Sequence, residues 1–422
     1  MLRATIIFLA VYAGLVVSKR HRPLVAWLGI GIALVVGALR PWEIVTGINW
    51  NVIGIFAGSL ILAELFIFSR VPETLSDHLI NRSANVGIAF LFIVAFASVI
   101  SIFMDNVVTV LITAPIALQL ARKAGVSPVA VIVGLAISSN LQGMAILIGD
   151  TPSMILAARM RMNFLDFFVY KNSGLPGIFW IVQLGAVAGF VVLYLFVKDN
   201  KHKPQHMVIT PVRSWMPVWL IVILIVALSF AMWIDEEFTW YGGTVCMVIG
   251  LAGMIWYGRR RCLADARQLV LGINWDTVLF LAAVFVLVYM LERRGTVDAL
   301  VARLSVLSGV SPFIIFTIVV WFSVLISAFV DNVPYITAML PVVIGFSETM
   351  AMRPELLVFG VLIGSCLGGN ITPIGASANL VAVGILEREG RHVSFGSFVR
   401  IGLPFTVAAT VVAYLALWLI YH

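Results

Sequence analysis

The sequence predicts an all-α polytopic membrane protein of two inverted repeats, each with a re-entrant hairpin and a broken helix. Its composition, its apolar runs and an internal duplication lead to this fold class. Of the 422 residues, 62% are hydrophobic and 11% charged, whereas a soluble domain carries about 25% charged residues. Such a chain must be solvated by lipid. At roughly 20 residues per span, its length allows about 10–12 transmembrane segments.

Twelve apolar runs can span or nearly span a bilayer. They lie at 4–18, 24–39, 52–68, 87–104, 129–148, 177–197, 215–234, 241–257, 276–291, 312–330, 356–374 and 402–421. A basic stretch, 19–22, follows the first run where a signal peptide would have a small-residue cleavage site. We therefore expect an uncleaved first span.

Two further apolar stretches, 106–120 and 332–346, contain Pro115 and Pro341 and begin at an Asp-Asn pair. They are short and polar at one end. We therefore expect re-entrant hairpins or half-helices rather than simple spans.

The duplication joins residues 105–149 to residues 331–375 without a gap, at a constant offset of 226. The twelve identical pairs are Asp105/Asp331, Asn106/Asn332, Val107/Val333, Pro115/Pro341, Pro128/Pro354, Gly134/Gly360, Ile137/Ile363, Ser139/Ser365, Leu141/Leu367, Gly143/Gly369, Ile148/Ile374 and Gly149/Gly375. Shared apolar composition explains the Ile, Leu and Val matches, but hardly the Asp-Asn pair, the prolines and the glycines. Such a repeated membrane segment is typical of a secondary transporter.

The basic residues predict that the repeats are inverted. Lys and Arg gather in the linker 198–213 and near 259–267, and the acidic loop 235–237 lies between them. Basic loops stay on the cytoplasmic side. Ile48-Asn49-Trp50 therefore follows an outside loop, whereas Ile273-Asn274-Trp275 follows an inside loop.

We divide the chain into a first inverted repeat at 1–197, a cytoplasmic linker at 198–213 and a second inverted repeat at 214–422. All three belong to one membrane domain, which we expect in the cell (inner) membrane.

Several classes of function are excluded by the residues. The net charge of +7 comes from basic residues in loops, so it indicates no nucleic-acid partner. Cys246, Cys262 and Cys366 show no disulfide or metal spacing. HExxH, GxSxG and Walker motifs are lacking, so we expect neither an enzyme nor an ATP-driven pump. No cofactor and no metal are expected, only H⁺ or Na⁺ as coupling ion.

The Asp-Asn pairs are the strongest candidates for coupling. A charge at membrane depth usually faces a cavity or a partner because its burial costs several kcal/mol. Asp105 and Asp331 are therefore candidate coupling carboxylates. Each can alternatively cap a helix N-terminus, and the two roles are compatible.

Two glycine-rich polar stretches, 138–153 and 368–379, predict helices broken near the membrane midplane, with exposed backbone groups for substrate and ion. The candidate binding residues are Asn140, Gly143, Asp150, Asn370, Thr372, Ser377 and Asn379, supported by Asn106, Asn332, Ser139, Pro115 and Pro341. Close helix packing through small residues is the alternative, but it explains the glycines and not the asparagines or the threonine. Elsewhere, Glu64 is expected to form an interfacial pair with Arg70, and Glu292 with 293–294.

The Asp-Asn-Val motif with its later proline, Leu147-Ile148-Gly149-Asp150-x-Pro152 and Gly369-Asn370-x-Thr372-x-Ile374-Gly375-Ala376-Ser377-Ala378-Asn379 resemble the ion-transporter superfamily. The resemblance covers nearly the whole chain. It is narrowest to the branch of the arsenite/antimonite permeases, the melanosomal P protein, citrate-type permeases and Na⁺/H⁺ antiporters of the NhaD type.

The resemblance implies elevator-like motion and a site lined by Asn140, Gly143, Asn370, Thr372 and Asn379. It also implies a homodimer and an association with an ATPase subunit. The first repeat departs from the family pattern, which reads Gly-Thr-Ala-Thr and then Asp-Pro-Pro-Asn. Residues 143–146 and 150–153 lack two of those hydroxyls and one amide, which suggests one ion site rather than two, or proton coupling through an Asp.

We therefore expect proton-coupled efflux of arsenite/antimonite or a related small anion, carried as the anion or its neutral acid. A pocket rich in neutral hydrogen-bonding groups and without arginine at membrane depth would suit a neutral trihydroxide. The alternatives are a Na⁺-coupled di/tricarboxylate (citrate-like) symporter and a Na⁺/H⁺ antiporter. A channel is disfavoured by the inverted repeats with broken helices.

Overall fold

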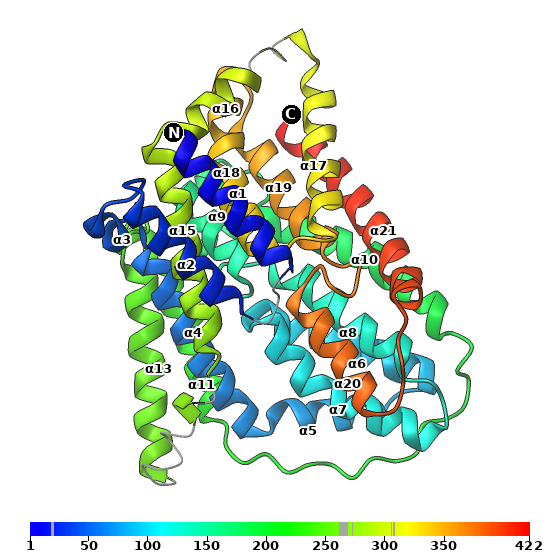
Figure 1. The fold of residues 1–422 in the computed structure, drawn as a ribbon. Coiled ribbons are helices and arrows are strands. Elements are labelled where there is room, and N and C mark those ends of the chain that lie inside the picture. Colours follow the sequence, from blue (N-terminus) through cyan, green and yellow to red (C-terminus); the bar gives the residue numbers. More distant parts are fainter. Residues whose placement is uncertain (18–20, 261–268, 272, 305, 307–308) are drawn as a thin grey trace.

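Helices follow the apolar runs of the sequence through the whole molecule (Figure 1). The computed structural model describes residues 1–17, 21–260, 269–271, 273–304, 306 and 309–422. Within these ranges, β-pairing is limited to one isolated bridge between Val169 and Pro176. Lys19, Arg20, Arg261, Cys262 and Arg267 lie outside the described residues.

The helices of the first half are α1 Leu2–Val17, α2 Arg22–Val35, α3 Pro41–Gly47, α4 Trp50–Ser69, α5 Val71–Asn81, α6 Val86–Phe103, α7 Asn106–Ala124, α8 Val129–Gly143, α9 Thr151–Met160 and α10 Ile178–Val197, with short 3₁₀ turns at Leu165–Phe167 and Tyr170–Asn172. Those of the second half are α11 Met216–Ser229, α12 Ala231–Ile234, α13 Tyr241–Arg260, α15 Trp275–Arg293, α16 Thr296–Leu304, α17 Pro312–Ser327, α18 Asn332–Thr349, α19 Pro354–Gly368, α20 Ser377–Arg388 and α21 Phe395–Tyr421.

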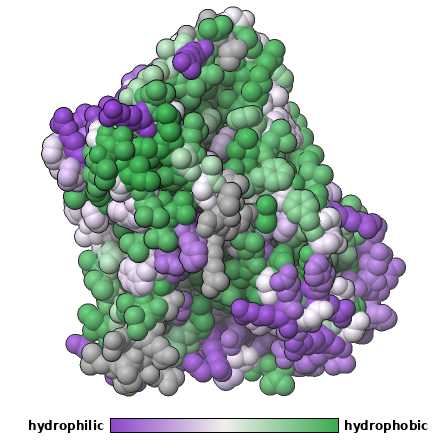
Figure 2. Space-filling view, viewed as in Figure 1, coloured by the Kyte–Doolittle hydropathy of each residue, from purple (hydrophilic) through white to green (hydrophobic). Residues whose placement is uncertain are grey.

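Each of the twelve apolar runs falls on a helix, so the predicted all-α polytopic class is confirmed. Among the described residues, seven helices are long and apolar enough to cross a bilayer: α4, α6, α7, α10, α13, α15 and α21. Shorter apolar helices accompany them. Exposed apolar residues recur on one helix face, as at Leu24, Leu28 and Ile32 of α2, and the visible face in Figure 2 is largely hydrophobic. Such stripes suit contact with lipid chains.

The two Ile-Asn-Trp motifs build the same helix start in both halves. Asn49 Oδ1 accepts the backbone N–H of Val52 at 3.1 Å, and Asn274 Oδ1 accepts that of Thr277 at 3.2 Å. The indoles of the following Trp50 and Trp275 each donate to a carbonyl five residues back. An Asn side chain in this position satisfies N–H groups that the first helical turn leaves unpaired.

Most of the helices belong to one of two groups. The arm group comprises α1–α4, α11, α13 and α15, in which α4 packs along α13 and α2 along α15. Small residues allow the first of these contacts: a Cβ added at Gly54 would lie 2.8 Å from the Cα of Gly243, as is common at helix interfaces in membranes.

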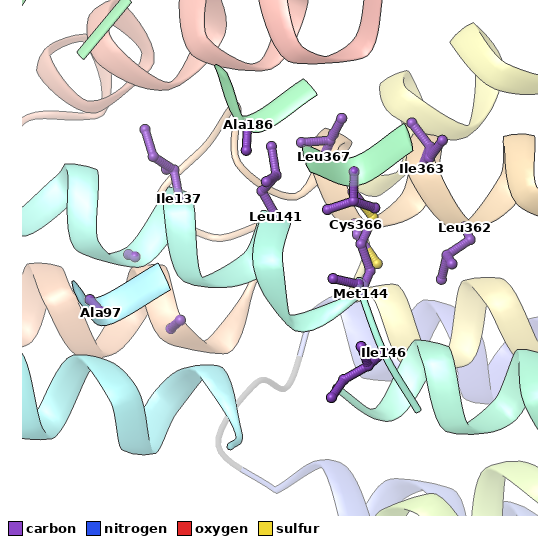
Figure 3. Packing of buried hydrophobic residues seen from close by; sticks show 14 of the residues in the cluster. Ala97, Ile137, Leu141, Met144, Ile146, Ala186, Leu362, Ile363, Cys366 and Leu367 are labelled. Atoms are coloured by element: carbon purple, nitrogen blue, oxygen red, sulfur yellow. The ribbon is translucent and has the colours of Figure 1, made fainter. Parts of the chain in front are cut away.

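The core group comprises α6–α10 and α17–α21. Within it α6 and α7 pack on α8, and α17 and α18 pack on α19. Near the ends of α8 and α19, buried Leu141 and Met144 meet Cys366 and Leu367 (Figure 3).

Both glycine-rich stretches interrupt a helix, as predicted. The first break separates α8 from α9 at residues 144–150, and the second separates α19 from α20 at residues 369–376. The two proline-containing stretches differ from the expectation of half-helices. Each continues past its proline as one helix, α7 with 19 residues and α18 with 18, because helix-forming residues follow and proline removes only one intrahelical bond. A re-entrant path for these helices stays a prediction.

The linker 198–213 runs along the lower edge of the molecule in Figure 1, beside α5. Asn81 donates to the carbonyl of Met207 at 2.9 Å and accepts the N–H of Met207 at 2.7 Å. Buried Asp77 accepts the N–H of Thr210 at 2.8 Å. Specific hydrogen bonds therefore hold the linker against α5.

Candidate functional site

A cavity of about 380 Å³ lies between the arm group and the core group, within the range of small-molecule sites. The arm group contributes Arg22, Phe56, Leu60, Glu64, Asn274, Asp276 and Phe280 to its wall, and the core group contributes Asp105, Asn106, Asn140, Asp150, Thr151, Asp331, Asn332 and Ser377. Both halves of the chain therefore meet at one polar site.

Asp105 and Asp331 cap the two helices that begin at the cavity. Asp105 Oδ1 accepts the N–H of Val107 at 2.9 Å, and Asp331 Oδ1 accepts the N–H of Val333 at 3.2 Å. Capping holds one oxygen of each carboxylate at the helix N-terminus. Both side chains remain on the cavity wall, so the cap and a coupling role are sterically compatible.

Asn106 and Asn332, the next residues, are held by equivalent serines. The Ser101 hydroxyl lies 2.8 Å from Asn106 Oδ1 and 2.9 Å from the carbonyl of Ser139. The Ser327 hydroxyl lies 2.9 Å from Asn332 Oδ1 and 2.5 Å from the carbonyl of Ser365.

All three pairs of positions share the offset of 226. Sequence reasoning missed both serines, although they lie just before the aligned segment at the same offset.

Asp150 is the last residue of the first break and precedes α9. Asn106 Nδ2 donates to Asp150 Oδ2 at 2.8 Å, and Asp150 Oδ1 accepts the N–H of Thr151 at 2.8 Å, capping α9. The equivalent position in the second half is Ala376. The two halves are thus alike in backbone but unlike in charge.

Three amides join the first half to the second break. Asn140 Nδ2 lies 2.8 Å from Asn370 Oδ1 and 3.1 Å from Asn379 Oδ1. Asn379 Nδ2 donates to the carbonyls of Gly369 and Thr372 at 2.8 and 2.9 Å. Asn140 reaches the cavity wall, whereas Asn370 and Asn379 are fully buried behind it.

The Thr372 hydroxyl is also turned away, because it donates to the carbonyl of Ala328. Asn370, Thr372 and Asn379 therefore form the support of the wall in this structure rather than its surface.

Glycine is required at the matched positions Gly143 and Gly369. A Cβ at Gly369 would lie 2.8 Å from Asn332 Oδ1, and one at Gly143 would meet Asn106 Oδ1. The absence of a side chain lets each helix end approach its asparagine. Of the two prolines, Pro341 is buried inside α18 and Pro115 is exposed on α7, and both lie away from this contact.

The expectation of a cavity without arginine is wrong. The Arg22 guanidinium lies at the wall, with Nη1 2.6 Å from Asp331 Oδ2 and 3.3 Å from Ser377 Oγ. In the sequence, Arg22 belongs to the basic stretch 19–22 that follows the first apolar run. It is instead the first residue of α2, and that helix starts against the N-termini of α18 and α20.

The expected pairing of Glu64 with Arg70 is also wrong. Arg70 lies 3.7 Å from Glu73, while Glu64 faces the cavity. Likewise, Glu292 pairs with Arg159 at 2.7 Å rather than with its neighbours in sequence. The cavity wall therefore carries five carboxylates, from Asp105, Asp150, Asp331, Asp276 and Glu64, and among the described lining residues one basic side chain, Arg22.

A cavity walled by both halves of a membrane bundle, at the point where two helices are interrupted, is the arrangement of a secondary transporter. The chain is a multi-pass membrane transporter and not an enzyme. It belongs to the citrate transporter family, CitMHS, whose profile matches residues 12–364.

Relatives of similar length have been found in several bacteria. A 46 kDa membrane protein of Mycobacterium leprae is 26% identical over 99% of this chain and 98% of its own. An uncharacterised transporter of Synechocystis is 25% identical over 98% of this chain and 96% of its own. The human P protein is 26% identical over 97% of this chain and 58% of its own, in keeping with the branch that the motifs resemble.

Two solved structures share the fold. The YdaH transporter of Alcanivorax borkumensis superposes with a TM-score of 0.57 at 15% identity, over 93% of this chain and 88% of that one. MtrF of Neisseria gonorrhoeae superposes with a TM-score of 0.56 at 14% identity, over 92% of this chain and 83% of that one. At these identities the likeness concerns the fold alone.

Proposed function

We propose that this transporter couples H⁺ or Na⁺ to the movement of a small anion or its neutral acid through the carboxylate-lined cavity. One observation carries the proposal: Asp105, Asp150 and Asp331, from both halves, meet on one cavity wall beside polar amides. Carboxylates at membrane depth are costly and usually serve ion or proton pathways.

The unequal halves support a single ion site. Asp150 bonds to Asn106 in the first half, and Ala376 stands at the matching position in the second. Both oxygens of Asp150 already accept hydrogen bonds, from Asn106 and from the N–H of Thr151. We therefore place the coupling ion in the second half, at Asp331, which lines the cavity beside Arg22.

Proton-coupled efflux of arsenite or antimonite is the first candidate. With five carboxylates and one guanidinium on the wall, a bare polyanion is repelled. A neutral trihydroxide avoids this repulsion and can bond to Asn140, Thr151 and Ser377, which line the cavity.

A citrate-like carboxylate, moved together with Na⁺ or H⁺, is the second candidate. Arg22 favours it, because a guanidinium binds carboxylates with paired hydrogen bonds. Coupled cations would offset the acidic wall. In a Na⁺/H⁺ antiporter, the third candidate, the same carboxylates would bind the cargo itself.

We further propose an elevator-type motion in which the core group moves against the arm group. The cavity lies between the groups, and ion pairs connect them, including Arg159–Glu292 at 2.7 Å and Arg161–Glu237 at 2.9 Å. Such exposed pairs are individually weak, so they can break in each transport cycle. A homodimer and an ATPase subunit stay predictions.

Flux measurements on purified protein in liposomes test these assignments. An imposed pH gradient should drive arsenite or citrate across the membrane. Flux that needs Na⁺ selects the Na⁺-coupled symporter, and proton movement on addition of Na⁺ alone selects the antiporter. The proposed function would be contradicted if neither an H⁺ nor a Na⁺ gradient moved arsenite or citrate, and if neither gradient drove the other ion across the membrane.

A further inference from the structure

Arg22 ties the arm group to two helix starts of the core group. Its Nη1 bonds to Asp331, the cap of α18, and to Ser377, the first residue of α20. The side chains of Arg22 and Asp331 are 16% and 14% exposed, so both charges are largely withdrawn from solvent. The pair therefore sits at the junction that an elevator motion would have to open.

Breaking the ion pair between Arg22 and Asp331 costs free energy. Arg stays protonated in proteins, and a buried charge without its partner is strongly destabilised. If H⁺ or Na⁺ neutralises Asp331, the guanidinium is left facing the cavity without a full counter-charge. An anionic group in the cavity then becomes its best partner.

Other charged and titratable groups favour a cation at this place. Asp331 lies close to Tyr12 of α1, to Tyr335 on its own helix and, across the cavity, to Asp105, Asp150, Asp276 and Glu64. The two tyrosines are neutral near neutral pH. The four other carboxylates attract cations and repel anions. An anion therefore enters mainly after a cation has bound in the cavity.

We propose that Arg22 is the anion anchor of the transporter and that it is exchanged between Asp331 and the cargo. In the empty state Asp331 holds it. With a cation on Asp331, Arg22 turns to an ionised oxygen of the cargo, which is therefore a small carboxylate or oxyanion. Cation and anion then favour each other's binding reciprocally. The inference rests on the proposed function and specifies its cargo and coupling.

Binding of citrate to the purified full-length protein tests the anchor. It is measured, at pH values between 6 and 8, as the rise in unfolding temperature that citrate causes. The variants are Arg22→Gln, Arg22→Lys, Asp331→Asn and, as control, Arg122→Gln, which removes an exposed pair with Glu389 outside the cavity wall. Each variant is compared with the unmutated protein at the same pH, so that the titration of citrate itself cancels.

Arg22→Gln should weaken citrate binding by at least about tenfold, Arg22→Lys should recover part of it, and Arg122→Gln should not change it. Asp331→Asn should bind citrate at least as tightly as the unmutated protein, because its neutral side chain no longer competes with the cargo for Arg22. A neutral solute such as arsenous acid should bind equally to the Arg22 variants.

Unchanged citrate binding in Arg22→Gln, or an unmutated protein that binds no citrate at any of these pH values, overturns the anchor. So does weaker citrate binding in Asp331→Asn than in the unmutated protein. The proposed function fails separately: citrate that binds through Arg22 but is never moved by an H⁺ or Na⁺ gradient in liposomes would leave the anchor standing and remove coupled transport.

Discussion

Ser101 and Ser327 make the same two contacts in the two halves of the molecule. Each hydroxyl touches the asparagine five residues ahead and a serine carbonyl 38 residues ahead. Ser101 therefore links the end of α6 to the start of α7 and to α8, and Ser327 links the end of α17 to the start of α18 and to α19. This repeated bridge places Asn106 and Asn332 at the cavity.

Replacing Ser101 by Ala should lower both stability and transport, because it removes the one O–H that a buried asparagine oxygen and a buried carbonyl share. The expected destabilisation is about 1–3 kcal/mol. In the first half the same change loosens Asn106, which bonds to Asp150. Ser101→Ala should therefore reduce coupled flux more than Ser327→Ala does, at matched protein amounts in liposomes.

Ser98, almost one turn earlier on α6, is the matched control. Its hydroxyl is buried and has no hydrogen-bond partner among the described atoms, so Ser98→Ala should leave unfolding temperature and flux nearly unchanged. Equal losses in Ser98→Ala and Ser101→Ala would show that the bridge has no special role.

Asp331→Asn should abolish gradient-driven transport in a protein that still folds, with a lowered unfolding temperature because Arg22 loses its counter-charge. Asparagine also caps helices, so the start of α18 is preserved, but the charge that would bind the coupling ion is gone. Flux should no longer respond to an imposed pH or Na⁺ gradient. Asp298→Asn, on exposed α16, serves as the control. A normal gradient response in Asp331→Asn would remove Asp331 from the coupling step.

The sequence predicted the elements of the fold because their signals are local. Apolar runs set the helices, and glycine-rich polar stretches set the breaks. The offset of 226 correctly paired Asn106 with Asn332 and Gly143 with Gly369, which occupy equivalent environments. The same offset also shows that Asp150 has no equivalent carboxylate in the second half, because Ala376 stands at the matching position.

The pairing of Arg22 with Asp331 could not be predicted in this way. The two residues are 309 positions apart, and only the packing of α2 against the second half brings them together. The excess of Lys and Arg in cytoplasmic loops already explains a basic residue after a first span. The sequence pattern therefore does not indicate a second role for Arg22. Glu64 was misjudged for the same reason: nearness to Arg70 in sequence outweighed a contact that depends on tertiary packing.

Asn81→Ala should release the linker between the two halves. The change removes both hydrogen bonds to Met207. Trypsin should then cut faster after Lys198, Lys201 and Arg213, which lie in this segment, because cleavage follows local opening. Thr74→Ser keeps the hydroxyl that bonds to the carbonyl of Thr210, so its cleavage rate should match that of the unmutated protein. Unchanged cleavage in Asn81→Ala would show that other contacts hold the linker.

Asp235 should make the loop between α12 and α13 sensitive to acid. Burial alone would raise the pKa of Asp235, but the N–H groups of Trp240 and Tyr241 at 2.8 and 2.9 Å, together with Thr239, lower it overall. Because the folded-state pKa lies below the unfolded value of about 3.9, its stabilising effect is present above that value. It disappears as the pH falls through the folded-state pKa.

Asp235→Ala should therefore lower the unfolding temperature at pH 7, by an amount that corresponds to about 1–2 kcal/mol. The charge-dependent part of this difference should be smaller at pH 3, because below about 3.9 the carboxyl of the unfolded chain binds a proton before that of the folded protein does. Thermal unfolding of both proteins at the two pH values measures it. A difference that stays constant between pH 7 and pH 3 would mean that packing of the side chain, and not its charge, holds the loop.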